Sequence, residues 1–269
     1  MPHCRQCGVE LPEAANFCPV CGTRVISETK PIERHRVFKV TGKPKVVVTN
    51  IALGSVKVKS GSKGEVTVDL DLRVPEDLDC SISQDNNAVA VNCRVKAGFW
   101  GWPSYIFGSG PRANILVSVP AESDLDLETR AGGIAVAGVK GTIIAESSAG
   151  TVDIQDCKGT VKARTRAGSV NLENVDGIVS ARSSAGSIKF SGVLSKGESW
   201  FRTSVGGIDI SLQGQPDLTV EASTSLGSIR CIPELTDAHY RRNQYTGRIG
   251  VGTGRLIAET KTGSITIHH

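Results

Sequence analysis

Two cysteine pairs near the N-terminus have the spacing of a metal site. Residues 4–22 read CRQCGVELPEAANFCPVCG, so Cys4 and Cys7 form one Cys-x-x-Cys-Gly unit and Cys18 and Cys21 form a second. Two such units complete the tetrahedral four-sulfur shell that zinc prefers. The shell leaves no position for a substrate water, so the sequence predicts a structural Zn²⁺ held by these four thiolates. The alternatives are a redox dithiol or disulfides, but a redox Cys-x-x-Cys is more often single and precedes a helix.

The residues between the two cysteine pairs fit the same interpretation. Together with the cysteines, Leu11-Pro12, Ala15 and Phe17 make residues 3–25 resemble the short zinc ribbon found at the start of many prokaryotic proteins. A segment this short cannot build a core and depends on its metal to fold. The ribbon carries two arginines against two glutamates, so we do not expect it to bind nucleic acid.

The other four cysteines, Cys80, Cys93, Cys157 and Cys231, are scattered along the chain, which indicates a reducing compartment. The first residues lack the basic and apolar regions of a signal peptide, and no apolar run approaches the roughly 20 residues that cross a bilayer. We therefore expect a cytoplasmic protein.

One segment, residues 97–112, is rich in aromatic side chains and interrupts the surrounding alternating pattern. Its aromatic residues are Phe99, Trp100, Trp102, Tyr105 and Phe107. Exposed, they could anchor a partner, a second copy or a membrane surface, because aromatic side chains give large contact area at low entropic cost. The alternative, which we favour over such an anchor, is a cap over the open end of a β-solenoid; of the anchoring roles, membrane contact is not the favoured one.

No catalytic pattern accompanies these residues. The chain contains no GxSxG, HExxH or phosphate-binding loop, and residues 37–238 contain no histidine, the usual general base. The carboxylates of Asp153, Glu173 and Asp209 fall singly along the chain, whereas glycan hydrolysis requires a pair. We therefore do not expect an enzyme. A glycan-active enzyme is a less favoured hypothesis than the two binding functions described below.

The elements that must position these residues are set by a repeated phrase. From Thr129 onward TRAGGIAV, SSAGTVDI, TRAGSVNL and SSAGSIKF follow one another, and LGSVKV at 53–58 is a further copy. The glycines recur about every 18 residues, at Gly132, Gly150, Gly168, Gly186, Gly206, Gly227 and Gly263, and Gly247 divides the last interval. A fixed period of this length indicates stacked coils that bury their faces against one another. Alternation of period two within each copy indicates strands.

Side chains at matching positions should therefore form columns. The positions two and four after each glycine are predicted to face inward, including Ile249 and Val251 after Gly247. Cys157 and Cys231 are then expected to be core thiols. A column of Ser and Thr, including Thr129, Ser147 and Thr165, should face inward beside a bend and bond to bend carbonyls.

The outward positions place like charges on successive coils. Arg164, Arg182 and Arg202 fall in one column, with Arg166 in the adjacent one. A basic stripe of this kind can attract a polyanion or an acidic partner surface. The alternative is a solvated face relieved by Glu146 and counterions, since no aromatic side chains interleave for base stacking.

These features predict an all-β chain: a parallel β-solenoid, similar to a single-stranded β-helix, of about 18 residues per rung, after a small zinc ribbon. The expected domains are the ribbon (1–25), a linker (26–36), an irregular β region that starts or caps the solenoid (37–128) and regular repeats (129–269). The net charge of +4 is modest and does not by itself indicate nucleic acid.

The phrase V-x-V-P … L-x-L-x-T-x-x-G-x-I-x-V, carried here by residues 117–136, resembles a bacterial and archaeal family of unknown function labelled as candidate adhesins. The resemblance covers about residues 45–267 and implies the fold rather than an activity. We expect a non-enzymatic scaffold that self-associates or binds a protein partner; a polyanion- or carbohydrate-binding module that uses the arginine stripe is the second hypothesis.

Overall fold

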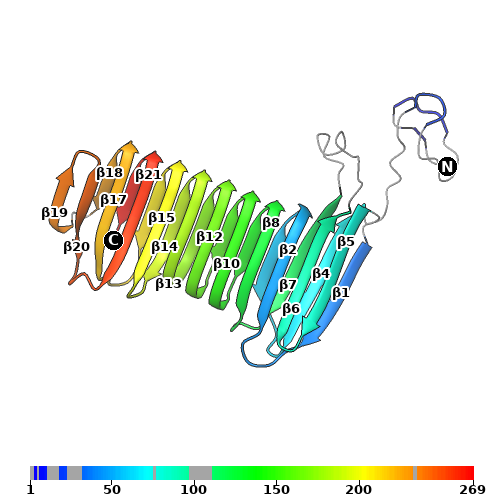
Figure 1. The fold of residues 1–269 in the computed structure, drawn as a ribbon, viewed down its shortest axis with the longest axis horizontal. Coiled ribbons are helices and arrows are strands. Elements are labelled where there is room, and N and C mark those ends of the chain that lie inside the picture. The colour runs from blue at the N-terminus through cyan, green and yellow to red at the C-terminus, as the bar shows by residue number, and fades with distance from the viewer. Residues whose placement is uncertain are drawn as a thin grey trace.

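The computed structural model describes residues 3–4, 6–10, 18–22, 32–74, 77–96, 111–232 and 235–269. Within these residues the fold is all β, with one continuous 22-stranded sheet that winds into a rod and no α-helix (Figure 1). No described segment forms a helix with the length and apolar character that a membrane crossing requires. The aromatic segment around Trp100 and Trp102 lies outside the described residues.

The centre of the rod is built from coils that each supply a longer and a shorter strand segment; in the strand β13 (Val170–Ala185) the shorter segment of one coil continues into the longer segment of the next. The longer strands form one side of the rod, the first wall, and the shorter strands form the second wall (Figure 1). Neighbouring coils from β8 to β13 pair in parallel at a separation of 18 residues, as in Ile143 with Val161 and Val161 with Val179, and the next coil pairs at 20 residues, as in Ala181 with Phe201. The central strands are β8 (Asp124–Ala131), β9 (Ile134–Ala137), β10 (Lys140–Ala149), β11 (Val152–Gln155), β12 (Lys158–Ala167), β13 (Val170–Ala185), β14 (Ile188–Leu194), β15 (Glu198–Val205) and β16 (Ile208–Leu212).

At the C-terminal end the coils do not stack in sequence order. The last coil, β21 (Gly254–Thr262) and β22 (Ile265–His268), lies between β15–β16 and the coil made by β17 (Leu218–Leu226) and β18 (Ile229–Ile232). The predicted coil at Gly247 is wrong. That segment forms β20 (Gln244–Ile249), which runs antiparallel to β17 and carries β19 (Thr236–Arg241), and Val251 is 78% exposed.

The same interchange occurs at the N-terminal end. The coil made by β2 (Lys45–Leu53) and β3 (Val56–Ser60) lies between β8–β9 and the pair β6 (Ala88–Val95) and β7 (Arg112–Val119). Three antiparallel strands complete this end. The strand β5 (Leu78–Asp85) pairs with β6, β4 (Glu65–Arg73) pairs with β7, and β1 (Ile32–Lys39) pairs with β4. The predicted linker 26–36 is therefore strand from Ile32 onward.

The aliphatic columns form the interior of the rod. Ile134, Val152 and Val170 pair in register and are fully buried, and Ile143, Val161 and Val179 do the same on the first wall. Aliphatic side chains in direct contact along the stack give each coil its stability through its neighbours. The predicted inward columns are confirmed, apart from the misplaced coil at Gly247.

The Ser/Thr column also faces inward, and its hydroxyls bond across coils. Thr165 Oγ1 donates to the carbonyl of Gly150 at 2.9 Å, and Ser183 Oγ donates to that of Gly168 at 2.9 Å. Thr129 is the exception, since it is 1% exposed and its Oγ1 has no partner among the described residues. Asn50, which occupies the matching position in the coil below, donates to the Gly54 carbonyl instead.

Of the four isolated cysteines, two are free thiols and two form a disulfide. Cys157 is fully buried, and Cys231 is partly buried beside Ile267, as expected of core thiols. Cys80 and Cys93 lie directly opposite each other on β5 and β6 and form a disulfide. The interpretation of these two cysteines as scattered residues is wrong, because a hairpin brings them together.

Candidate metal centre and basic face

The four N-terminal cysteines come together as the sequence predicts. Their sulfurs all lie within 4.8 Å of one another, with 3.5 Å between those of Cys4 and Cys21 and 3.5 Å between those of Cys7 and Cys18. A tetrahedral zinc with Zn–S bonds of about 2.3 Å separates its sulfurs by about 3.8 Å. The donor set therefore fits zinc in charge, number and spacing.

Two backbone turns hold the sulfurs in this arrangement. The amide of Gly8 donates to the carbonyl of Cys4 at 2.7 Å, and that of Gly22 donates to the carbonyl of Cys18 at 2.9 Å. Both glycines have positive φ angles, +72° and +69°, which a side chain would disfavour. Cys4 and Cys18 are buried while Cys7 and Cys21 are exposed, so the cluster lies near the surface. Its four sulfurs would fill all four coordination positions of a tetrahedral ion. This is the arrangement of a structural zinc site.

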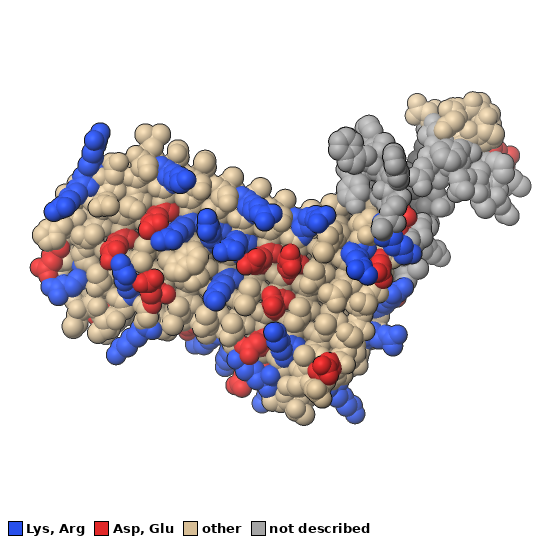
Figure 2. Space-filling model, viewed as in Figure 1, with Lys and Arg blue, Asp and Glu red and all other residues tan. Residues whose placement is uncertain are grey.

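The predicted arginine stripe forms on the outer face of the first wall. Arg164 pairs in register with Arg182, and Arg182 with Arg202, so the three side chains leave successive strands β12, β13 and β15. We call these three residues the basic row. Acidic residues continue the same row at both ends, with Glu146 before Arg164 and Glu259 after Arg202. Figure 2 shows this side of the rod, with basic side chains distributed along its length and acidic ones among them.

The end members of the basic row are paired, but its centre is not. Arg164 Nη1 lies 3.7 Å from Glu146 Oε1, and Arg202 Nε lies 2.8 Å from Glu259 Oε2. Arg202 also lies 5.6 Å from the ring centroid of Trp200, an aromatic contact on this face that the sequence interpretation missed. Among the described residues Arg182 has no ion pair, so its charge is available to a ligand.

Arg182 lies in a polar hollow of about 320 Å³, which we call the basic hollow. Its lining includes Arg164, Arg166, Arg182, Ser148, Ser184 and Glu128. Arg166 Nη1 lies 3.5 Å from Ser148 Oγ, at the limit of a hydrogen bond. Three of the four predicted anion-binding arginines therefore share one hollow, while Arg202 is not among its lining residues. Guanidinium groups and hydroxyls are suited to bind carboxylate, sulfate or phosphate oxygens.

A second hollow contains residues that the sequence interpretation did not select. It measures about 620 Å³ over the outer faces of β1, β4, β7 and β3, and His35 Nδ1 lies 2.5 Å from Asp69 Oδ1 on its surface. In the same hollow Asn114 donates to Asp71 Oδ2 at 3.2 Å. The sequence did not select His35 because residues 26–36 were predicted to be a linker. The charged run around His35 lacks the alternating apolar pattern that predicts a strand.

Comparison with known protein families supports both parts of the chain. A model of the zinc-ribbon domain matches residues 3–25, and a model described as Toastrack DUF4097 matches residues 123–268. No curated protein matches the chain.

Several solved structures resemble the chain at low sequence identity. A candidate adhesin from Bacteroides fragilis is 15% identical, with 90% of this chain and 100% of that chain covered and a TM-score of 0.40. A candidate cell adhesion protein from Clostridium sporogenes is 10% identical, with 89% and 99% covered and a TM-score of 0.39. A candidate lipid-binding protein from Parabacteroides distasonis is 12% identical, with 87% and 96% covered and a TM-score of 0.37.

Proposed function

The chain belongs to the Toastrack DUF4097 family, and from this premise we propose that it is a non-enzymatic scaffold that binds an acidic partner through its basic face. The rod is a single-stranded, β-helix-like solenoid of about 18 residues per coil, and the ribbon is a structural module that Zn²⁺ stabilises. The observation that carries the proposal is Arg182, an unpaired guanidinium between two other arginines on a rigid wall.

Another arginine on the same wall, Arg255, differs from Arg182 because it has two acidic partners. Arg255 lies between Glu221 and Glu198, with both carboxylates at 3.0 Å, and these contacts raise the pKa of its guanidinium. Such a side chain is already satisfied. Like charges at adjacent register positions repel, and an anion placed over Arg182 would relieve that repulsion.

Binding of an anionic polymer tests the proposal. Fluorescent poly-L-glutamate represents an acidic protein surface, and a fluorescent heparin oligosaccharide represents the second candidate, a polyanion or acidic carbohydrate. We expect Arg182→Glu to weaken binding at least tenfold and to reduce its salt dependence. Lys189→Glu is the matched control, because it makes the same charge change at an exposed position on β14, in the second wall.

The outcomes separate the hypotheses. Preference for poly-L-glutamate supports the protein partner, and preference for heparin supports the second candidate. Equal losses in Arg182→Glu and Lys189→Glu would show that only net charge matters and would end the proposal for both.

Self-association remains part of the proposal, but the ends of the rod change its expected route. Open coils could stack end to end, but β5 and β19–β20 add antiparallel strands at the two ends of the first wall. On the second wall, the far edge of β18 pairs with no described strand, so it is the better candidate for contact with a second copy. Light scattering between 10 and 200 µM tests this, and a strict monomer would count against it.

We propose a cytoplasmic location, supported by the four-thiolate site, which needs reduced cysteines to bind zinc. In that compartment a disulfide such as Cys80–Cys93 is typically transient or regulatory rather than permanent. Fractionation of the native cells with immunodetection would test the location, and recovery only outside the cytoplasm would overturn it.

A further inference from the structure

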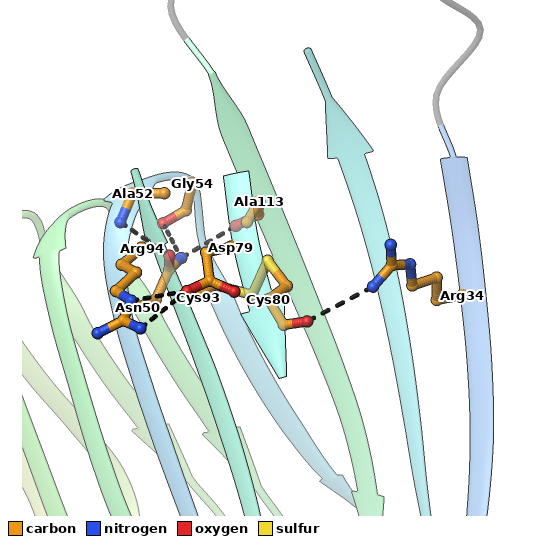
Figure 3. The surroundings of a disulfide bond; sticks show 9 residues. All are labelled: Arg34, Asn50, Ala52, Gly54, Asp79, Cys80, Cys93, Arg94 and Ala113. Carbon is orange, nitrogen blue, oxygen red and sulfur yellow. Dashed lines mark hydrogen bonds and ion pairs between the residues drawn. A yellow bond between two sulfur atoms is a disulfide. The ribbon is translucent and has the colours of Figure 1, made fainter. Parts of the chain in front are cut away.

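The N-terminal end of the rod is closed by the two edge strands β5 and β1. Each pairs with a single neighbour among the described strands, β5 with β6 and β1 with β4. Arg34 on β1 reaches across this end, and its Nη1 lies 3.4 Å from the Cys80 carbonyl on β5 (Figure 3). The contact is long and exposed, so it adds little to the attachment of β5.

Few buried side chains hold β5 in place. Along Leu78–Asp85 only Leu78 is buried, and the inward Cys80 and Ile82 are partly exposed. On the outer face Asp79 and Arg94 form an ion pair at 2.8 Å, with both side chains about half exposed or more. Exposed pairs of this kind contribute little. Apart from the antiparallel backbone pairing with β6, the covalent link is therefore the main fastening of this strand.

The disulfide joins two residues that the hairpin places directly opposite each other. Cys80 and Cys93 have Cα atoms 4.2 Å apart and are separated by 13 residues, with the turn at Asn86 and Asn87 between their strands. Cys93 is 1% exposed, but Cys80 is only partly buried. The partly exposed Cys80 is therefore the side of the bond from which a thiolate in solution would have to attack, as exchange requires.

The same chain carries thiols that must stay reduced. The four sulfurs of the ribbon bind zinc only as thiolates, and Cys157 and Cys231 form no disulfide. An environment that keeps these six cysteines as thiols contains reductants. Such reductants also react with an accessible disulfide, so Cys80–Cys93 would exchange with them. This combination favours a reversible bond over a permanent staple.

We propose that Cys80–Cys93 is a redox latch on the N-terminal end of the rod. In the oxidised form it fastens β5 over the outer edge of β6; in the reduced form β5 detaches more readily and uncovers that edge. Reduction by a dithiol, or by two molecules of a monothiol such as glutathione, breaks the S–S bond and gives two cysteine thiols and the oxidised reductant as a disulfide. Oxidation by glutathione disulfide reverses each change, with release of two glutathione thiols.

The uncovered strand is suited to pairing. The inward side chains of β6, Val89, Val91 and Cys93, are buried against the core, and its other edge is already paired in parallel with β2. Loss of β5 leaves a row of unpaired backbone groups on an ordered strand, which is the usual site of strand addition. The latch thus controls an edge at the opposite end of the rod from β18.

The test uses the full, zinc-loaded chain in glutathione buffers of graded ratio, with acid quenching, alkylation and mass spectrometry of the peptide spanning 78–95. Hydrogen exchange then compares β5 in the oxidised and reduced forms. Opening of a hairpin that loses a cross-link of this loop length should increase on the order of 100-fold. We expect faster exchange in Leu78–Asp85 by 10-fold or more, with β10 and β12 unchanged.

Two variants provide the controls. Cys80→Ser/Cys93→Ser should exchange rapidly in β5 at every glutathione ratio, while Cys231→Ser should keep the wild-type redox response. If the double variant fails to fold, the wild-type titration still decides. A bond that never forms, a bond that no glutathione ratio reduces, or equal protection of β5 in both forms would overturn the latch.

Discussion

At the residue scale, one hydroxyl per coil ties each bend to the coil before it. Thr165, Ser183 and Thr203 each donate to a glycine carbonyl of the neighbouring coil at 2.9 Å. These bonds are shielded from water because the donors are at most 6% exposed. A buried acceptor left without its donor costs more than the bond itself contributes, so this column stabilises the bends as well as the stack.

The column contains its own control. Thr165→Val removes a donor from the Gly150 carbonyl and should lower the free energy of unfolding by about 1 kcal/mol. Thr129→Val removes an equally buried hydroxyl that has no partner, so it should be neutral or stabilising. Urea denaturation measures both, and equal losses would contradict the assigned bonds.

The proposed zinc centre belongs to the residue scale because four side chains would form it. Cys18→Ser should abolish the single bound zinc, measured by mass spectrometry of the metal, because the shell loses one of its four thiolates. The rod should keep its far-ultraviolet circular dichroism and its melting temperature, since its strands pair only with one another. Full zinc retention in Cys18→Ser would contradict the site.

Asp217 gives one turn a pH dependence. Thr253 Oγ1 donates to its Oδ2 at 2.7 Å and the Gly252 amide to its Oδ1 at 2.6 Å, and these bonds lower the pKa of the carboxyl group. A folded pKa below the unfolded value of about 3.9 means that the contribution is present above that value and is lost as the pH falls through the folded pKa. Asp217→Asn should therefore be slightly less stable than wild type at pH 7, and the difference should disappear towards pH 2. Thermal unfolding across this range measures it, and a constant difference would contradict the assignment.

At the element scale, the bends between the two walls depend on a column of glycines packed backbone to backbone. A Cβ atom added to any glycine after the first would lie between 1.9 and 2.3 Å from the carbonyl oxygen of the preceding glycine in the column. The column runs in stack order through Gly54, Gly132, Gly150, Gly168, Gly186, Gly206, Gly263 and Gly227. No side chain can move to relieve such a clash, so the bend requires glycine.

Two alanine substitutions separate the destabilisation caused by the steric clash from that caused by the backbone conformation. Gly168→Ala places a methyl group 2.3 Å from the Gly150 carbonyl oxygen at a φ of +146° and should cost about 3 kcal/mol or more. Gly42→Ala also has a positive φ, +53°, but its Cβ meets nothing within 4 Å, so about 1 kcal/mol is expected. Denaturation of both variants decides, and similar losses would show that conformation alone sets the requirement.

At the scale of the whole molecule, the order of the coils in space differs from their order in the sequence. The first coil and the last coil of the sequence each lie second from an end of the stack. The coil β2–β3 is inserted beneath β6–β7, and β21–β22 is inserted beneath β17–β18. An inserted coil contacts two neighbours, whereas a terminal coil contacts one. The first and last coils of the sequence are therefore each held between two neighbours, which opposes unravelling of the rod from its ends.

Truncation tests this fastening. Removal of residues 254–269 should uncover both β15–β16 and β17–β18, because the deleted coil lies between them. Amides of β15 and β17 should lose protection from hydrogen exchange, while those of β10 and β12 keep it. A loss confined to β17 and the strands beyond it would instead indicate coils stacked in sequence order.

The sequence by itself determined the clustering of the four N-terminal cysteines, the period of 18, the inward columns and the basic row, because each depends on residues at fixed local spacing. Cys4 with Cys7, or Ile143 with Val161, are recognisable from their separation alone. Only the tertiary structure decided the order of the coils at the ends, the pairing of Cys80 with Cys93, the strand at His35 and the ion pair of Arg202 with Glu259. The interval of 36 residues between Gly227 and Gly263 equals two periods and so suggested a coil at Gly247, whereas the intervening segment folds back as a hairpin. Strand pairing at the ends is set by which edge remains open in space, and local periodicity does not record it.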